Sequence, residues 1–480
     1  MASLKSDVIS GAKWSSISQI GRQSIQLVTI IVLARLLSPS DFGLIAMATV
    51  VIGFITLFKD MGTSAAVIQR RNLSDELLSS IFWVNAAMGL FTMLLLFVLS
   101  PLAAIFYHEP RITPLMRVLS LTFLISGFSI VQQACLQRDL KFNKLARVEL
   151  FAALSGSIVG IGSAALGCGA WSLVFQTLTV ATTTTILLWA YTNWKPKLIF
   201  RRSEISSVSN YSLNITGFNI VNFFARNADN LLIGRFLGAQ NLGYYNLAYN
   251  IMLLPLQNIS GAIDRVMFPA YAQIQDDNVK FRYAYLKVVG AISLITFPMM
   301  MCLMVLSQEV VLTFFGQQWL AVVPLVIILS TVGIVQSIST MNGNIYRAKG
   351  HTSLQFRVGS LFSILITISF AIGLRWGING VAAAYAITSL FLVYPAFAIP
   401  FRLVDLRIWD LGVALWRPFL SGIFMLTIIF GLKFLLPADI PNGLVLCIMI
   451  PLCVIVYTIS SWIINRNQIL GILDTIGVRI

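Results

Sequence analysis

The sequence predicts an all-α protein that crosses a membrane many times. Hydrophobic residues make up 58% of its 480 residues, and charged residues make up only 11%. A soluble chain of this length could not cover so much apolar surface. The apolar residues are gathered in continuous stretches of about 20 residues or more, the length at which a helix crosses a bilayer. The pattern does not favour membrane-spanning strands, because the stretches are long and continuous and lack the segments of about ten residues with alternating hydrophobicity that are typical of a β-barrel.

About fourteen segments have this length and character. In chain order they are 14–36, 43–67, 79–106, 114–136, 146–167, 170–192, 208–235, 243–269, 284–306, 320–345, 354–374, 378–400, 411–435 and 443–464. Each is read as one spanning helix, because in lipid a helix satisfies its own backbone hydrogen bonds.

The loops between these segments carry an uneven charge that predicts the orientation of the chain. If the N-terminus is cytoplasmic, the loops on that side hold most of the Lys and Arg, among them Arg70, Arg138 and Lys195. The opposite loops hold Arg111 and Arg375. The positive-inside rule then places both termini in the cytoplasm. The net charge of +15 is therefore mostly topological and does not indicate a nucleic-acid partner.

The chain also resembles itself. One offset aligns IIVLARLLSPSDFGL (30–44) with NLLIGRFLGAQNLGY (230–244), so that Arg35 matches Arg235 and Gly43 matches Gly243. Nearly the same offset pairs GAWSLVFQ (169–176) with GINGVAAA (377–384). Six helices separate matching segments, so both copies enter the membrane in the same direction, as in a parallel repeat.

This repeat divides the chain into three parts. We expect a six-helix lobe at 1–200, a second six-helix lobe at 201–405, and an additional helix pair at 406–480. Pseudo-symmetric lobes of this kind usually enclose a central site, which rocking of the lobes exposes to each side in turn. Functional residues are therefore expected on helix faces that meet between the lobes.

The first helix of each lobe has a polar stripe centred on an arginine. In the 14–36 helix the stripe consists of Ser15, Ser18, Gln19, Arg22, Gln26 and Thr29. In the 208–235 helix it consists of Asn219, Asn222, Arg226, Asp229 and Asn230. At about 100° per residue each set falls within an arc of roughly 100°. Because lipid does not tolerate such stripes, we interpret them as lining a cavity between the lobes.

The residue types in these stripes favour an anionic substrate rich in hydroxyl groups. Arginine offers a fixed cationic fork that suits phosphate, and amides bind sugar hydroxyls. We therefore predict that Arg22 and Arg226 approach phosphate, and that amides bond sugars. The predicted amides are Gln26, Asn219, Asn222 and Asn230. Isolated polar residues elsewhere, such as those of the 320–345 helix, are better explained as contacts between helices.

Three carboxylates within predicted helices are candidates for coupling transport to an ion gradient. They are Asp60, Asp229 and Asp264. An ionisable residue inside the membrane is a functional candidate by default. Structural pairing with nearby Lys59, Arg226 or Arg265 is an equally good explanation for them.

The sequence provides no sign of a metal, a cofactor or an enzyme. The five cysteines are scattered without a CxxC motif, and His108 and His351 lie far apart in loops. There is no GxxxxGK[ST] motif for ATP. The longest outer loop, SQEVVLTFFGQQW (307–319), has the single carboxylate Glu309 and no acid/base pair. Together these observations favour a transporter.

Several stretches resemble a known family. They are GAKWS (11–15), VLARLL with FGL after it (32–44), DMGTSAAVIQRRNLS (60–74), LQRDLKFNKLA (136–146), GYYNLAYN (243–250), RVMFPAYAQIQDD (265–277) and FGQQW (315–319). They are similar to the Wzx-like bacterial polysaccharide exporters of the colanic-acid-exporter type, within the multidrug/oligosaccharidyl-lipid/polysaccharide (MOP) superfamily. The resemblance implies a MATE/MOP-like fold of two six-helix lobes and a terminal helix pair.

The resemblance also implies a function. Such proteins are flippases that move undecaprenyl-pyrophosphate-linked oligosaccharides to the periplasmic leaflet of the bacterial inner membrane, for capsule, exopolysaccharide or O-antigen synthesis. It implies coupling to H⁺ or Na⁺, and polysaccharide polymerase and glycosyltransferase partners. Two alternatives with the same architecture stay open: a flippase for a peptidoglycan precursor, and a multidrug or cation antiporter.

Overall fold

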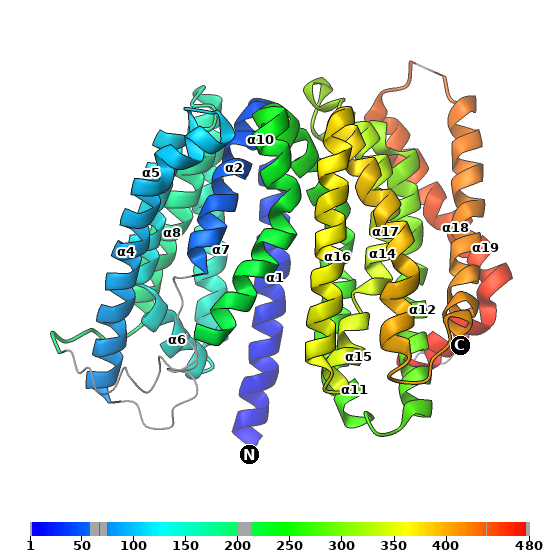
Figure 1. The fold of residues 1–480 in the computed structure, drawn as a ribbon, viewed down its shortest axis with the longest axis horizontal. Coiled ribbons are helices and arrows are strands. Elements are labelled where there is room, and N and C mark those ends of the chain that lie inside the picture. The colour runs from blue at the N-terminus through cyan, green and yellow to red at the C-terminus, as the bar shows by residue number, and fades with distance from the viewer. Residues whose placement is uncertain (1, 58–66, 68–73, 200–212, 438, 477–480) are drawn as a thin grey trace. The chain divides into compact units, whose positions relative to one another are not determined.

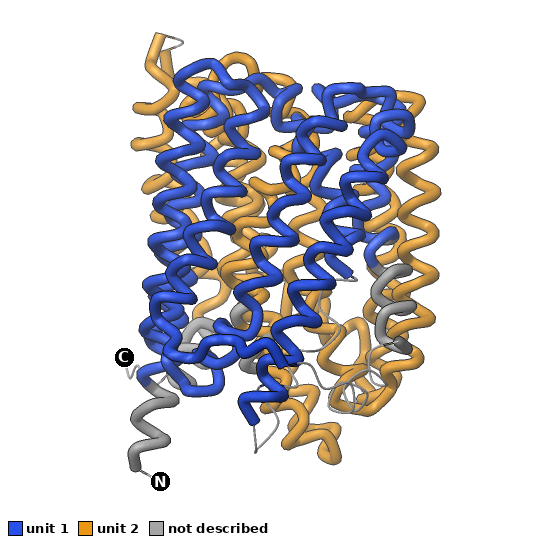
Figure 2. Tube along the Cα trace, turned by 90° about the vertical axis from the view of Figure 1, so that its left-hand side faces the viewer, with its two compact units in different colours: residues 1–243 blue, residues 244–480 orange. Residues whose placement is uncertain are grey.

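In the computed structural model, all regular secondary structure within the described residues is helical. The structure describes residues 2–57, 67, 74–199, 213–437 and 439–476, and within these it leaves out the side chains at 2–9, 12, 213–222, 225, 262, 265, 266 and 467–476. The chain packs as two compact units, Met1–Gly243 and Tyr244–Ile480, which Figure 2 distinguishes by colour. Helix α10 (Leu213–Asn258) carries the chain from one unit into the other. The lobe boundaries predicted from the repeat stay a prediction.

The first unit consists mainly of long helices that run roughly parallel to one another (Figure 1); the short α6 is bent by 43° from α5. They are α1 (Ala2–Leu36), α2 (Pro39–Thr56), α4 (Asp75–Tyr107), α5 (Ile112–Gly127), α6 (Ile130–Arg138), α7 (Phe142–Ala165), α8 (Trp171–Tyr191) and the first part of α10.

The second unit continues from the second part of α10. Its further helices are α11 (Ser260–Gln273), α12 (Asn278–Val305), α13 (Ser307–Phe314), η1 (Gln317–Trp319), α14 (Val322–Ser339), α15 (Asn342–Ala348), α16 (Thr352–Gly373), η2 (Leu374–Trp376), α17 (Gly377–Phe401), α18 (Ile408–Leu435) and α19 (Asn442–Ile476).

The helices confirm a polytopic membrane protein. Ten helical stretches in the described residues are long and apolar enough to span a membrane, or eleven if the bent pair α5–α6 is one span. One of the ten, Thr352–Phe401, contains two expected segments, which separate at η2 and Gly377 (φ +69°). Two further expected segments fall in α10 and α11, outside this set. The number fourteen therefore stays a prediction.

Local sequence explains where several helices begin and end. Ser38 caps α2: its side chain accepts a hydrogen bond from the backbone N–H of Asp41, and the Asp41 carboxylate accepts one from the backbone N–H of Ser38. Pro39 occupies the first position of α2, where no backbone N–H is needed. Within α10, Gly238 adopts φ +83°, a conformation that glycine reaches at little cost, and the helix breaks there.

Two glycines allow α2 and α10 to cross backbone to backbone. A Cβ atom added at Gly43 would overlap the carbonyl oxygen of Ala239, and one added at Gly243 would overlap the carbonyl oxygen of Pro39. The offset that aligns Gly43 with Gly243 also aligns Pro39 with Ala239, so the contact is reciprocal. Reciprocal contacts of this kind are what a two-fold relation between two segments produces.

The core of the second unit combines aromatic side chains with polar contacts between helices. Tyr271, Phe281, Tyr285, Phe397 and Phe401 are each no more than 1% exposed and belong to one cluster. The hydroxyl group of Tyr285 donates a hydrogen bond to Asn342 Oδ1 (2.6 Å). Such contacts satisfy polar groups that lipid cannot.

Candidate functional site

The predicted stripe on α1 is divided between two environments. Ser18 and Thr29 are 2% exposed and bond to side chains of α7: Ser18 donates to Glu149, and Thr29 donates to Ser157 (2.7 Å). Arg22 and Gln26, one helical turn apart, are exposed. Ser18 and Thr29 therefore hold α1 against α7, whereas Arg22 and Gln26 remain exposed on the surface of α1.

The predicted stripe on α10 is divided in the same way. Arg226 is exposed, and Asn230, one turn further, is half-buried. Asp229 is buried, and its Oδ1 accepts a hydrogen bond from the backbone N–H of Asn230 (2.8 Å). The side chains of Asn219 and Asn222 lie outside those that the structure describes.

Both arginines are available to a ligand. Arg22 and Arg226 form no ion pair or hydrogen bond with any residue that the structure describes. Each has an amide side chain one helical turn away on its own helix, Gln26 on α1 and Asn230 on α10. All four belong to the unit Met1–Gly243. A cationic fork beside an amide can bind a phosphate group next to a hydroxyl group.

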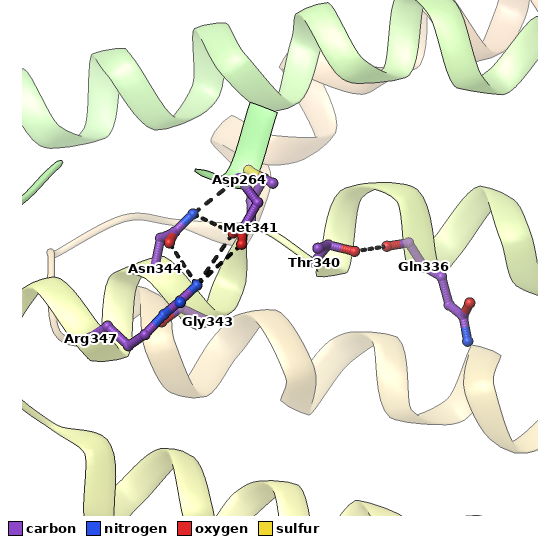
Figure 3. A network of polar contacts seen from close by, with 7 residues as sticks. All are labelled: Asp264, Gln336, Thr340, Met341, Gly343, Asn344 and Arg347. Atoms are coloured by element: carbon purple, nitrogen blue, oxygen red, sulfur yellow. Dashed lines mark hydrogen bonds and ion pairs between the residues drawn. The ribbon is translucent and has the colours of Figure 1, made fainter. Parts of the chain in front are cut away.

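Asp264 has structural partners among the described side chains; the side chain of Arg265 lies outside them. Figure 3 shows Asp264 of α11 with two residues of α15. Asp264 Oδ1 accepts a hydrogen bond from Asn344 Nδ2 (2.8 Å) and pairs with Arg347 Nη2 at 3.3 Å. Arg347 also lies over the ring of Phe268, 5.0 Å from its centroid. This network weakens the case for Asp264 as an ion-coupling group.

The polar residues of the expected 320–345 helix serve packing, as the sequence favoured. Ser337 accepts a hydrogen bond from Thr296 of α12 (3.0 Å), and Gln336 contacts Tyr385 of α17 (2.5 Å). Thr340 bonds back to the carbonyl of Gln336 (2.8 Å), as Figure 3 also shows.

Of the other two carboxylate candidates, the structure describes Asp229 but not Asp60. Asp229 is buried and partnered, as described above. Asp60 and its neighbour Lys59 lie outside the described residues, so its role stays a prediction.

Sequence reasoning missed Glu149, the carboxylate on α7 that accepts the hydrogen bond from Ser18. Glu149 falls within the expected 146–167 segment and within a membrane-span candidate, Phe142–Ala165. A carboxylate in this candidate span, which also contains Lys144 and Arg147, was a usable signal. Its bond to Ser18, in contrast, joins positions 131 residues apart and has no signature in the sequence.

The turn between α4 and α5 holds a second polar group in the same unit. His108 at the end of α4 contacts Arg235, whose guanidinium lies 5.7 Å from the ring centroid of Phe106. Glu109 accepts two hydrogen bonds from Arg111 (2.8 and 2.9 Å). The Arg111 guanidinium holds the pKa of Glu109 below its usual range. Arg235 thus has local partners in His108 and Phe106.

Metal ligands do not gather in the described residues: no group of three or more His, Cys, Asp or Glu lies close enough to hold an ion. Cys302 of α12 and Cys453 of α19 are closer than their sequence positions suggest, with Sγ atoms 3.4 Å apart, and both are free thiols.

Comparison with known proteins identifies relatives over most of the chain. Residues 32–324 match the family described as polysaccharide biosynthesis protein. The chain is 30% identical to lipopolysaccharide biosynthesis protein WzxC of Escherichia coli over 422 residues, 85% of each chain. It is 31% identical to teichuronic acid biosynthesis protein TuaB of Bacillus subtilis over 440 residues, 90% of each chain.

Two solved structures share the fold. The lipid II flippase MurJ in an inward closed conformation superimposes with a TM-score of 0.76 at 17% identity, covering 95% of this chain and 100% of MurJ. An inward-facing multidrug resistance MATE family transporter of the MOP superfamily gives 0.64 at 16% identity, covering 80% and 94%. At these identities the likeness concerns the fold alone, which is MurJ- and MATE-like.

Proposed function

Because the chain belongs to the polysaccharide biosynthesis protein family, with Wzx-type relatives in the MOP superfamily, we propose that it is a flippase for lipid-linked oligosaccharides. Its substrate is an undecaprenyl-pyrophosphate-linked repeat unit, which moves from the cytoplasmic to the periplasmic leaflet of the bacterial inner membrane. The product feeds exopolysaccharide, capsule or O-antigen synthesis by a polymerase, after glycosyltransferases have built the unit.

One observation carries this proposal beyond the family. Two exposed arginines, Arg22 in the candidate span Lys13–Leu36 and Arg226 in α10, have no partner among the described residues, and each lies one turn from an amide. An arginine near the centre of a spanning helix costs about 2.5–3.5 kcal/mol on insertion scales. Neither Arg22 nor Arg226 has an ion pair among the described residues to offset that cost. A diphosphate bound between guanidinium groups supplies the missing charge, and Gln26 and Asn230 suit the adjoining sugar hydroxyls.

The proposed transporter has fourteen spans arranged as a parallel repeat. The lobes are 1–200 and 201–405, followed by the pair 406–480, with both termini in the cytoplasm. The reciprocal contact of Gly43 and Gly243 supports a two-fold relation between the repeats. Rocking of the lobes exposes the substrate site to each leaflet in turn, and an H⁺ or Na⁺ gradient drives the cycle.

The test is export in a strain from which the gene has been deleted. Loss of the chain should remove surface polysaccharide and cause undecaprenyl-linked oligosaccharide to build up on the cytoplasmic leaflet. The wild-type chain should reverse both effects. Arg226→Ala should reverse neither while reaching the membrane in normal amount, and Arg226→Lys should restore only part of export, because lysine lacks the bidentate fork.

Arg417→Ala is the matched control. Arg417 also lies in a membrane helix, α18, but its guanidinium has a partner, the ring of Trp416 at 5.4 Å. This variant should export normally. Full export by Arg226→Ala would remove Arg226 from the substrate site.

A second candidate function is supported by the fold likeness to MurJ: transport of a peptidoglycan precursor, which is also a lipid pyrophosphate. Complementation separates the two. A chain that rescues growth when the cell's own peptidoglycan-precursor flippase is depleted, and leaves surface polysaccharide unchanged when deleted, has this second function.

A further inference from the structure

The seam between α1 and α7 combines small residues, the larger side chain of Leu150 and the carboxylate of Glu149. A Cβ atom added at Gly21 would lie 2.7 Å from Leu150 Cδ2, so the two helices are in close contact there. Thr29 and Ser157 bond further along the seam. Glu149 precedes Leu150, and its Oε2 accepts the hydrogen bond from Ser18.

Glu149 falls inside a candidate membrane span. It is seven residues from the start of the candidate span Phe142–Ala165, which places it roughly 10 Å along the helix. Ser18 lies five residues from the start of the candidate span Lys13–Leu36. The two residues therefore meet within both spans, where an ionised carboxylate is costly.

No cation compensates Glu149 within the described part of the chain. The described charged or titratable side chains on α7 and on the helices packed against it are Lys13, Arg22 and Arg35 on α1, Cys135 and Arg138 on α6, Lys144 and Arg147 on α7, and Tyr191 on α8. None of them bonds to Glu149. Lys144 instead donates to the carbonyl oxygen of Tyr191 (3.1 Å). Ser18 is thus the one described partner of the carboxylate.

We propose that Glu149 is the proton-binding group of this transporter and that its protonation controls the α1–α7 seam. The inference rests on the proposed transport function. The step is proton binding alone: a proton from water adds to a carboxylate oxygen of Glu149 and later returns to water. An ionised Glu149 needs water at its second oxygen, whereas the protonated form tolerates a dry seam.

Proton binding therefore favours a closed seam, and proton release favours a hydrated, looser one. Ser18 and Arg22 lie one turn apart on α1, so a movement of α1 at the seam also moves Arg22. In this way the charge on Glu149 influences the position of Arg22, the proposed phosphate-binding residue, although Glu149 itself does not contact the substrate.

The experiment follows the distance between α1 and α7 in the purified full chain, reconstituted without substrate. Nitroxide labels are placed on cysteines at Ser15 and Asn143, which are both exposed, after replacement of the five native cysteines by serine. The distance distribution is measured by pulsed electron paramagnetic resonance between about pH 4 and pH 9. With Glu149 unaltered, the distance distribution should contain two populations, and the ratio of the two should change with pH.

Glu149→Gln keeps an oxygen that accepts the Ser18 hydrogen bond and cannot ionise, so it should hold the low-pH population throughout. Asp75→Asn is the control, because Asp75 is exposed in the same unit and pairs with Lys197 (2.8 Å). It should titrate like the unaltered chain. A distance that does not change with pH, or a Glu149→Gln chain that titrates normally, overturns the inference.

The readout needs no glycan, which separates the inference from the function. A chain that titrates as expected but moves no undecaprenyl-linked oligosaccharide in vesicles refutes the proposed function alone. If the chain moves the oligosaccharide and an imposed proton gradient does not accelerate it, the function stands and Glu149 is not its coupling group.

Discussion

An arginine inside a membrane helix takes its role from the side chains around it. Arg347 meets the carboxylate of Asp264, and Arg117 lies 4.8 Å from the ring centroid of Phe97. These two are held by the protein itself. Arg22 and Arg226 have no such partner among the described residues, which is why we assign them to the substrate.

The contribution of a protein partner to such an arginine can be measured at the pair formed by Asp264 and Arg347. Arg347→Ala leaves the carboxylate of Asp264 without its cation, so it should lower stability by about 1 kcal/mol; the value is modest because both side chains are partly exposed. Asp264→Ala together with Arg347→Ala should cost less than the sum of the single changes. Thermal unfolding of the four chains in detergent checks this cycle. Strict additivity would mean that the two side chains do not interact.

At the scale of helices, the sequence predicted which residues share a side but not which neighbour covers that side. Helical periodicity groups Ser18, Arg22, Gln26 and Thr29 within one arc of α1, but of these four only Ser18 and Thr29 are buried. It could not show that α7 covers Ser18 and Thr29, because that contact depends on a helix more than a hundred residues away. The partner of Asp264 was missed for the same reason: Arg347 is 83 residues distant, whereas Arg265 is adjacent.

The crossing of α2 and α10 yields a prediction about packing. Gly43→Leu places a side chain against the backbone of Ala239, which cannot move aside as a flexible side chain can. We expect a loss of roughly 1–3 kcal/mol in stability and a loss of export. Gly162→Leu in α7 is the control, since nothing lies within 4 Å of a Cβ atom there. Thermal unfolding and surface polysaccharide are the measurements; equal stability of the two variants contradicts the close crossing.

At the scale of the whole molecule, the terminal helix pair is joined to the second unit by contacts within that unit. Lys433 of α18 pairs with the buried Glu309 of α13 (2.8 Å) and donates to the carbonyl oxygen of Val305 (3.1 Å). Cys302 of α12 faces Cys453 of α19. Hydropathy predicted two helices after the repeat, at the positions of α18 and α19. It could not predict these contacts, because they join residues far apart in the sequence that belong to no common periodic pattern.

If α12, α18 and α19 move as one body during transport, a covalent link between α12 and α19 should leave export unchanged. The sulfur atoms of Cys302 and Cys453, 3.4 Å apart, need to approach to about 2 Å to form a disulfide, a small adjustment. In a chain with Cys135, Cys168 and Cys447 replaced by serine, a mild oxidant should therefore link them. Proteolysis between the two helices followed by gel electrophoresis reports the link, and Cys302→Ser is the control that cannot form it. Export that stops on oxidation of the paired chain and continues in the control would show that α19 slides along α12, and the terminal pair would then be a moving part of the transport cycle.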